Sequence, residues 1–333
     1  MDYTAFFEAN RLLWNDKTDP HIQSDFYGMA AFKKGANTLN AIEMEQLGDV
    51  AGQKLLHLQC HFGQDTLSLA RMGAEVTGID LSDKAIDRAR ELAEGLRLPA
   101  RFLCCNLYDL SSHLNGETFD QVFTSYGALP WLPDLIPWGQ LIARHLRPGG
   151  TFHLVEFHPV VWMFDNDFQT VAYSYFNRET IEESVEGTYA DRTAPISGTA
   201  YSWNHGLGEV FEALERAGLQ VTRFREYDYS PYPCFPEVVI NAKGPRLSDP
   251  GPRGQDTDGL RASRRKIPAL NMPNSAFLVY LCGMFKRGIS VCRASGFPGF
   301  AVRNPIVCST ERWLHPDALS EVCPLICTLT CRT

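Results

Sequence analysis

The most constraining feature of the chain is a segment in which a strand, a tight loop and a helix follow one another. The apolar run of Leu55, Leu56 and Leu58 predicts a buried parallel strand. Residues 59–64 predict a tight loop around Gly63, and residues 65–71 predict the start of a helix. A unit of this kind presents backbone N–H groups to a polar ligand at the end of the strand. The segment therefore predicts an α/β fold with a ligand site at this loop.

A second apolar run, residues 75–79, ends in a carboxylate at Asp80. An acidic side chain directly after the second strand of such a fold can accept hydrogen bonds from both hydroxyls of a ribose. The alternative is that Asp80, like Ser82, only caps the helix that follows. The position of Asp80 directly after the strand favours the ribose role, and the two segments together predict a nucleoside site.

The loop resembles the first motif of the class I S-adenosylmethionine-dependent methyltransferases, acidic-x-G-x-G-x-G. The matching positions here are His57, Gln59, His61 and Gly63, so only the last glycine remains. The longer string HLQCHFGQDTLSLARMGAEVTGID is similar to a small-molecule branch of that family in which Q-C-H-F-G-Q-D is the usual form of the loop. The resemblance covers residues 1 to about 240 well.

The resemblance implies which residues bind S-adenosyl-L-methionine. They are the loop residues, the acidic end of the second strand, and the ends of the third and fourth strands: Gln59, Cys60, His61, Phe62, Gly63, Asp65, Asp80, Leu81, Asn106, Leu107, Ser125 and Tyr126. It also implies that the N-terminal segment closes over the cofactor, which makes Trp14, Asp25, Phe26 and Tyr27 candidate contacts. Candidates for a base that removes a proton from the acceptor are Glu156, His158, His205 and Tyr126.

The predicted fold is an α/β, Rossmann-like, doubly wound sheet of seven mostly parallel strands, with helices on both faces and strand order 3-2-1-4-5-7-6. The later strands are expected at residues 101–105, 119–124, 151–156 and 220–230, and a seventh, antiparallel strand near residues 275–281. Ligands in such sheets bind beyond the carboxyl ends of the strands. The candidate binding residues all lie at such ends.

The chain is expected to divide into an N-terminal helical cap at residues 1–52, a methyltransferase domain at residues 53–285, and a divergent, cysteine-containing tail at residues 286–333. Within the domain, the aromatic insertion at residues 157–205 is expected to form a hairpin and a substrate lid, and residues 243–266 predict a flexible excursion. The tail lacks clear periodicity. Disorder, irregular docking, a partner-binding extension and an altered reading of the gene all remain open for it, and the sheet is expected to be complete without it.

Charge and cysteine content exclude several classes of protein. A formal net charge of −8 argues against a general binder of nucleic-acid backbones. The ten cysteines contain no C-x-x-C pair, so no metal site is expected, and free thiols are favoured. The N-terminus has no basic region followed by an apolar core, and no apolar run is long enough for a membrane span. We therefore expect a cytoplasmic protein without a membrane partner.

The expected function is transfer of a methyl group from S-adenosylmethionine to a small-molecule acceptor by direct in-line displacement. The aromatic insertion indicates an acceptor that is partly apolar and planar. One alternative is a protein that binds S-adenosylmethionine without turnover. A nicotinamide-dependent oxidoreductase is a weaker alternative, because its fingerprint G-x-G-x-x-G needs three glycines where this loop has one.

Overall fold

The computed structural model describes residues 2–165, 170–231, 238–241, 244–247 and 326–333. These residues belong to one compact unit, residues 1–250 together with 314–333. The predicted excursion at residues 243–266 lies almost wholly outside the described residues, as does the second unit, residues 251–313.

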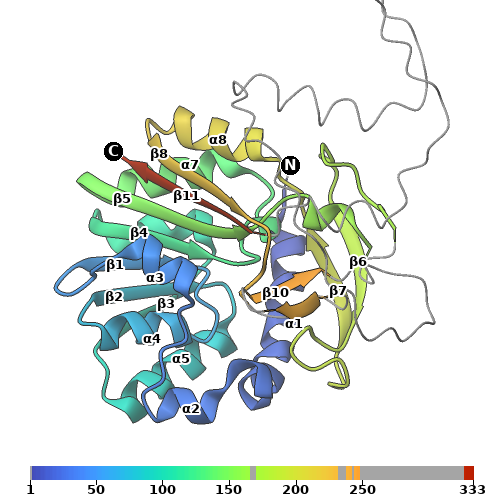
Figure 1. The fold of residues 1–333 in the computed structure, drawn as a ribbon, viewed down its shortest axis with the longest axis horizontal. Helices are drawn as coiled ribbons and strands as arrows, with labels where there is room; N and C mark the ends of the chain where they lie inside the picture. Colours follow the sequence, from blue (N-terminus) through green and yellow to red (C-terminus); the bar gives the residue numbers. More distant parts are fainter. Residues whose placement is uncertain (1, 166–169, 232–237, 242–243, 248–325) are drawn as a thin grey trace, which may run out of the picture. The chain divides into compact units, whose positions relative to one another are not determined.

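A seven-stranded sheet forms the centre of this unit (Figure 1). Its order is β3-β2-β1-β4-β5-β11-β8. The strands are β1 (Lys54–Leu58), β2 (Glu75–Asp80), β3 (Ala100–Cys104), β4 (Phe119–Ser125), β5 (Leu146–Phe157), β8 (Gln220–Tyr227) and β11 (Ile326–Arg332). The first five are parallel, and β11 is antiparallel to both of its neighbours. The predicted fold class and strand order are confirmed.

The seventh strand is not where the sequence analysis placed it. β11 lies between β5 and β8, with Ile326 opposite Phe157 on one side and Tyr227 on the other. The predicted segment, residues 275–281, lies outside the described residues. The expectation that the tail is dispensable for the sheet is therefore wrong for its last residues. A central strand is buried on both faces, so burial in β11 does not follow the alternation of its residues: Thr328 is as buried as Cys327 and Leu329, and the cysteines pack as small apolar side chains.

Helices cover both faces of the sheet. The helices of the unit are α1 (Thr4–Gln23), α2 (Met29–Lys33), α3 (Ala41–Leu47), α4 (Gln64–Arg71), α5 (Asp83–Leu96), α6 (Leu110–Leu114), α7 (Leu135–His145) and α8 (Leu207–Arg216). Trp138 of α7 and Leu214 of α8 are fully buried in one apolar cluster, whereas Ile42 of α3 and Leu69 of α4 are buried in another cluster on the opposite face. Short 3-10 turns connect these elements: η1 (Asp25–Tyr27), η2 (Leu107–Asp109), η3 (Leu129–Trp131) and η4 (Val161–Met163).

The insertion after β5 contains the expected hairpin. Strands β6 (Ile181–Glu186) and β7 (Ser197–Ser202) pair antiparallel in a two-stranded sheet. A further pair, β9 (Val238–Asn241) and β10 (Gly244–Leu247), follows β8. The side chain of Asn10 in α1 pairs with the backbone of Tyr201 in β7, donating at 2.8 Å and accepting at 2.9 Å. Helix α1 thereby holds the hairpin at the ligand-binding end of the sheet.

Candidate functional site

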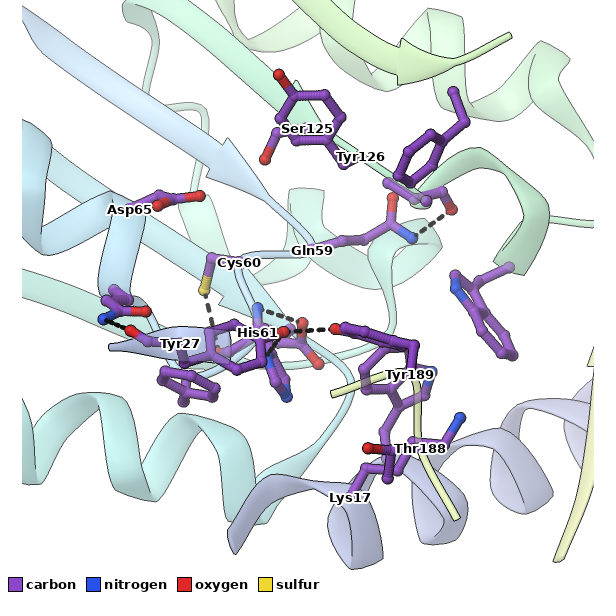
Figure 2. A pocket seen from close by; sticks show the side chains of 18 of the residues that line it. Lys17, Tyr27, Gln59, Cys60, His61, Asp65, Ser125, Tyr126, Thr188 and Tyr189 are labelled. Carbon is purple, nitrogen blue, oxygen red and sulfur yellow. Dashed lines mark hydrogen bonds between the residues drawn. The ribbon is translucent and has the colours of Figure 1, made fainter. Parts of the chain in front are cut away.

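A pocket of about 1100 Å³ opens at the carboxyl ends of β1, β2 and β4, between the sheet, the N-terminal helices and the β6–β7 hairpin (Figure 2). All twelve residues that the sequence analysis assigned to cofactor binding line this pocket. Trp14, Phe26 and Tyr27 of the N-terminal segment also line it, whereas Asp25 does not. Small-molecule pockets commonly measure about 300–1,000 Å³. The pocket therefore lies just above the upper end of that range.

The loop after β1 adopts a glycine-like backbone without the glycines. Gln59 has φ 54° and His61 has φ 52°, both in the left-handed region, and Gly63 has φ 75°. A left-handed conformation costs a residue with a side chain about 1–2 kcal/mol. The Gln59 amide offsets part of that cost by donating to the Ala128 carbonyl at 2.9 Å. The backbone at these positions thus matches the glycine motif although the residues do not.

Gly63 is required for packing. A Cβ atom built at Gly63 would lie 2.6 Å from Cε1 of Phe102 and 3.0 Å from Cβ of Ala89. The space beside Gly63 is therefore occupied by the Phe102 ring of β3 and by Ala89 of helix α5. The glycine permits close approach of helix and strand, as the third glycine of such loops does.

Asp80 organises the loop from the end of β2. Its Oδ2 accepts from the backbone N–H of His61 at 2.8 Å, and its Oδ1 accepts from Ser82 at 2.9 Å. Burial raises the pKa of the Asp80 carboxyl. The backbone hydrogen bonds lower this pKa, but the effect of burial is larger. Ser82 itself caps α5, because its hydroxyl accepts from the backbone N–H of Ala85 at 3.1 Å. The helix-cap alternative for Asp80 is therefore wrong, and its carboxylate faces the pocket.

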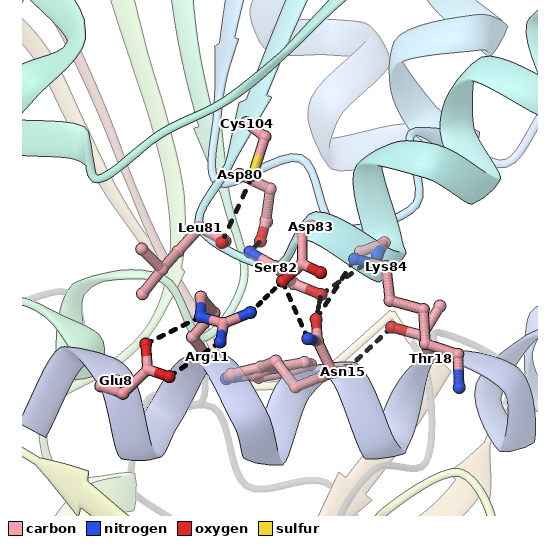
Figure 3. Close-up of polar contacts among 12 residues, drawn as sticks. Glu8, Arg11, Asn15, Thr18, Asp80, Leu81, Ser82, Asp83, Lys84 and Cys104 are labelled. Carbon is pink, nitrogen blue, oxygen red and sulfur yellow. Dashed lines mark hydrogen bonds and ion pairs between the residues drawn. The ribbon is translucent and has the colours of Figure 1, made fainter.

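Helix α1 closes the site beside Asp80 (Figure 3). Asn15 accepts from the Ser82 hydroxyl at 2.6 Å and donates to Asp83 at 2.8 Å. Arg11 forms an ion pair with Asp83 as well. These contacts fix the N-terminal segment against the start of α5, so the helix that lines the pocket is attached to the segment that directly follows Asp80.

Two carboxylates, one buried (Glu43) and one partly buried (Asp65), lie at the Tyr126 side of the pocket. Tyr126 donates to Glu43 at 2.9 Å, and Thr38 donates to Asp65 at 2.6 Å. Burial raises the pKa of both carboxyls, and the charge of Asp65 raises that of Glu43 further. The sequence analysis found Asp65 and Tyr126 but missed Glu43 and Thr38. No motif marks those two, because they come from the segment before β1.

Three of the four candidate bases do not line the pocket, and each has a structural partner. The Glu156 carboxylate accepts from the backbone N–H groups of residues 127, 128, 129 and 157, and so holds the turn after β4. His158 lies 3.0 Å from Glu226, and His205 contacts the Leu132 carbonyl at 2.6 Å. The structure places Glu156, His158 and His205 away from the pocket, and a catalytic role for them stays a prediction that this geometry does not support. Tyr126 is the candidate base that remains at the pocket.

Comparison with known proteins relates part of the chain to a protein family. Residues 55–150, which contain the loop, Asp80 and the first four strands, match the methyltransferase domain family. Residues 55–150 therefore carry a methyltransferase domain, and the strand order of the sheet is that of the class I S-adenosylmethionine-dependent type. The cofactor of this family is S-adenosyl-L-methionine.

The chain covers different shares of the proteins that it resembles, and it spans about three fifths of the first of them. An uncharacterised methyltransferase of Synechocystis is 36% identical over 137 residues, which are 39% of this chain and 59% of the relative. The ubiquinone biosynthesis O-methyltransferase of Coxiella burnetii is 28% identical over 56% of this chain and 78% of its own length. The crystal structure of an S-adenosylmethionine-dependent methyltransferase from Mesorhizobium loti aligns over 90% of this chain and 100% of its own, with 18% identity and a TM-score of 0.45.

No helix in the ranges given above is both long and apolar enough to cross a membrane. Within the same ranges, no group of three or more histidine, cysteine or acidic side chains is arranged to hold a metal ion.

Proposed function

We propose that this methyltransferase transfers a methyl group from S-adenosylmethionine to a small-molecule acceptor by direct in-line displacement. The observation that carries the proposal is the convergence of the left-handed loop at Gln59 and His61 with Asp80 on one large pocket. When bound, the cofactor supplies a methyl group on a sulfonium that is its own leaving group. The protein then has to bind the two reactants, align the acceptor with the S-methyl bond and exclude water.

The residues of the pocket fit the parts of the cofactor. We assign the ribose hydroxyls to the Asp80 carboxylate, which has acceptor capacity beyond its backbone contacts. Asn106 and Leu107, at the end of β3, are assigned to the adenine. The backbone of the loop at residues 59–63 and the residues at the end of β4, Ser125 and Tyr126, are assigned to the amino-acid end. Each of these residues lines the pocket.

We assign the acceptor to the side of the pocket under the insertion. Trp131, Trp162 and Tyr189 line this part, and such aromatic walls suit a planar, partly apolar molecule. One relative is named a ubiquinone biosynthesis O-methyltransferase, which makes hydroxylated aromatic compounds the first acceptors to test.

Tyr126 is our candidate for the residue that accepts the proton of the acceptor hydroxyl. Its hydroxyl donates to Glu43 Oε2, and burial raises the pKa of both groups. A proton leaving an acceptor hydroxyl can pass to Tyr126 Oη as the phenol proton moves to Glu43 Oε2. This path needs no other residue.

The test has a binding arm and a turnover arm. Calorimetric titration should show binding of S-adenosylmethionine and S-adenosylhomocysteine but not of NAD. Formation of S-adenosylhomocysteine should then be followed with a panel of hydroxylated aromatic compounds. Binding of NAD in place of S-adenosylhomocysteine would refute the proposal. Tight cofactor binding without turnover on any acceptor class would favour a non-catalytic binding protein.

A further inference from the structure

Lys17 is a buried cation in the wall of the pocket. Its side chain comes from α1 and only 6% of its surface is exposed. Nζ lies 5.0 Å from the ring centre of Trp14 and 5.9 Å from that of Trp131. Among the residues that the structure describes, no carboxylate forms an ion pair with it. Since buried lysines are nearly always paired, the charge of Lys17 calls for a partner that the described chain does not provide.

Two histidines beside Lys17 have unused hydrogen-bonding atoms. His21 is fully buried, and neither of its ring nitrogens has a partner in the described part of the chain. The same holds there for Nε2 of His61, whose ring centre lies 5.1 Å from that of His21. Burial and the nearby Lys17 charge lower the pKa of His21 to about 3, so its imidazole is neutral and can donate one N–H.

Aromatic rings enclose this group. Tyr27 stacks on His21 at 5.3 Å, and Tyr189 of the hairpin loop lies 4.8 Å from His21. In Figure 2, Lys17 and Asp65 lie toward opposite sides of Gln59 and His61. The pocket therefore has a cationic, aromatic side and a carboxylate side. A ligand group for the cationic side must be anionic and able to accept several hydrogen bonds.

We propose that Lys17 and His61, which line the pocket, form a binding subsite for a carboxylate, with the His21 ring packed beside them. The inference rests on the proposed function in that the carboxylate belongs to a ligand of methyl transfer. Two sources have this chemistry: the amino-acid end of the cofactor, and an acceptor that carries a carboxylate on an aromatic ring. The Lys17 ammonium supplies the charge, and the His61 imidazole, whose Nε2 has no partner in the described residues, supplies a further donor.

The test uses benzoate and its neutral analogue benzamide as probes of the full-length protein, observed by ligand NMR. The wild type should bind benzoate at least ten-fold more tightly than benzamide. Lys17→Met should abolish that preference, and Lys17→Gln should do the same, which separates lost charge from altered packing. Lys33→Met, which removes an exposed lysine of α2 outside the pocket, should leave it unchanged.

A second pair of ligands distinguishes the two sources. S-adenosylhomocysteine carries the amino-acid end, and 5′-methylthioadenosine lacks it. The carboxylate is that of the cofactor if S-adenosylhomocysteine displaces benzoate and if Lys17→Met weakens binding of S-adenosylhomocysteine by ten-fold or more. Binding of 5′-methylthioadenosine should then be unchanged by the same substitution. If benzoate binds beside S-adenosylhomocysteine and only benzoate depends on Lys17, the carboxylate is that of the acceptor.

The proposal is overturned if wild type shows no preference for benzoate and Lys17→Met leaves S-adenosylhomocysteine affinity unchanged. It is also overturned if Lys17→Met weakens both nucleosides equally, because that would indicate a general structural role. Failure of the proposed function looks different. Neither nucleoside would then bind to the wild type, whatever the benzoate result.

Discussion

Replacing Lys17 by methionine should stabilise the ligand-free protein at neutral pH. Burial lowers the pKa of Lys17 from 10.5 to about 8. A shift of one pKa unit corresponds to about 1.4 kcal/mol, so holding the charge in the folded state costs about 3 kcal/mol. Methionine keeps an unbranched side chain against Trp14 and Trp131 without the charge. Allowing for the lost contact of the cation with the two rings, the free energy of unfolding should rise by about 1–3 kcal/mol.

The sign and the pH window follow from the direction of the shift. Below about pH 8 both the folded and the unfolded chain carry the Lys17 proton, and the folded state bears the full cost. Between pH 8 and 10.5 only the unfolded chain keeps that proton, so this group makes the wild type more stable as the pH rises. Above 10.5 the cost is gone. The advantage of Lys17→Met should therefore be greatest at pH 7 and shrink steadily toward pH 10.5.

Urea unfolding of wild type, Lys17→Met and Lys33→Met at a series of pH values measures this difference directly. Other groups that titrate in the same range affect all three proteins alike, so they cancel when variants are compared. Lys33→Met should lie within about 0.5 kcal/mol of wild type throughout. A Lys17→Met protein less stable than wild type at pH 7 would refute the reasoning. So would a stabilisation that does not change with pH.

Four further outcomes are expected. Asp80→Ala should weaken S-adenosylhomocysteine binding by about 1.5–3 kcal/mol in calorimetry, and it should also lower the melting temperature because two loop N–H groups lose their acceptor. Gly63→Ala should cost at least about 1–2 kcal/mol of stability in urea unfolding, since φ is positive and the new Cβ meets Phe102. Glu156→Ala should cost about 3 kcal/mol or more by the same measurement, because it leaves several buried N–H groups without an acceptor; loss of turnover at unchanged stability would contradict this role. A chain ending at Leu325 lacks β11 and should be insoluble or molten by circular dichroism, and a folded truncated protein that still binds S-adenosylhomocysteine would show that β11 is dispensable.

The sequence predicted the parts of the fold and site whose signals are local. Apolar runs that end in polar residues located β1 and β2. The loop after β1 and Asp80 at the end of β2 then marked the pocket. The order of the strands followed from the family resemblance. These signals are strong because a parallel strand, a tight turn and a carboxylate each leave a pattern within a few residues.

The parts that the sequence did not predict depend on contacts between distant segments. β11 pairs with β5 although about 170 residues separate them in the chain, and the composition of β11 does not indicate which strand it pairs with. Glu43 and Lys17 face the pocket only because helices α1 and α3 pack over it. Glu156 was proposed as a base because it ends a strand near the site, yet its carboxylate turns toward backbone N–H groups. Position along a strand predicts the neighbourhood of a side chain but not its partner.

The costs in this fold are concentrated at the pocket. Of the five non-glycine residues with positive φ in the described chain, Gln59, His61 and Tyr126 line it, and the other two end helices. A left-handed residue with a side chain costs about 1–2 kcal/mol, and the unpaired Lys17 adds a cost of similar size. A single substitution would remove each of these free-energy costs, since glycine suits the left-handed positions 59 and 61 and methionine suits position 17. Features that lower stability persist where function requires them. The pocket is therefore best understood as a site built for a bound ligand, which lowers these costs by accepting hydrogen bonds from the loop and neutralising the buried ammonium.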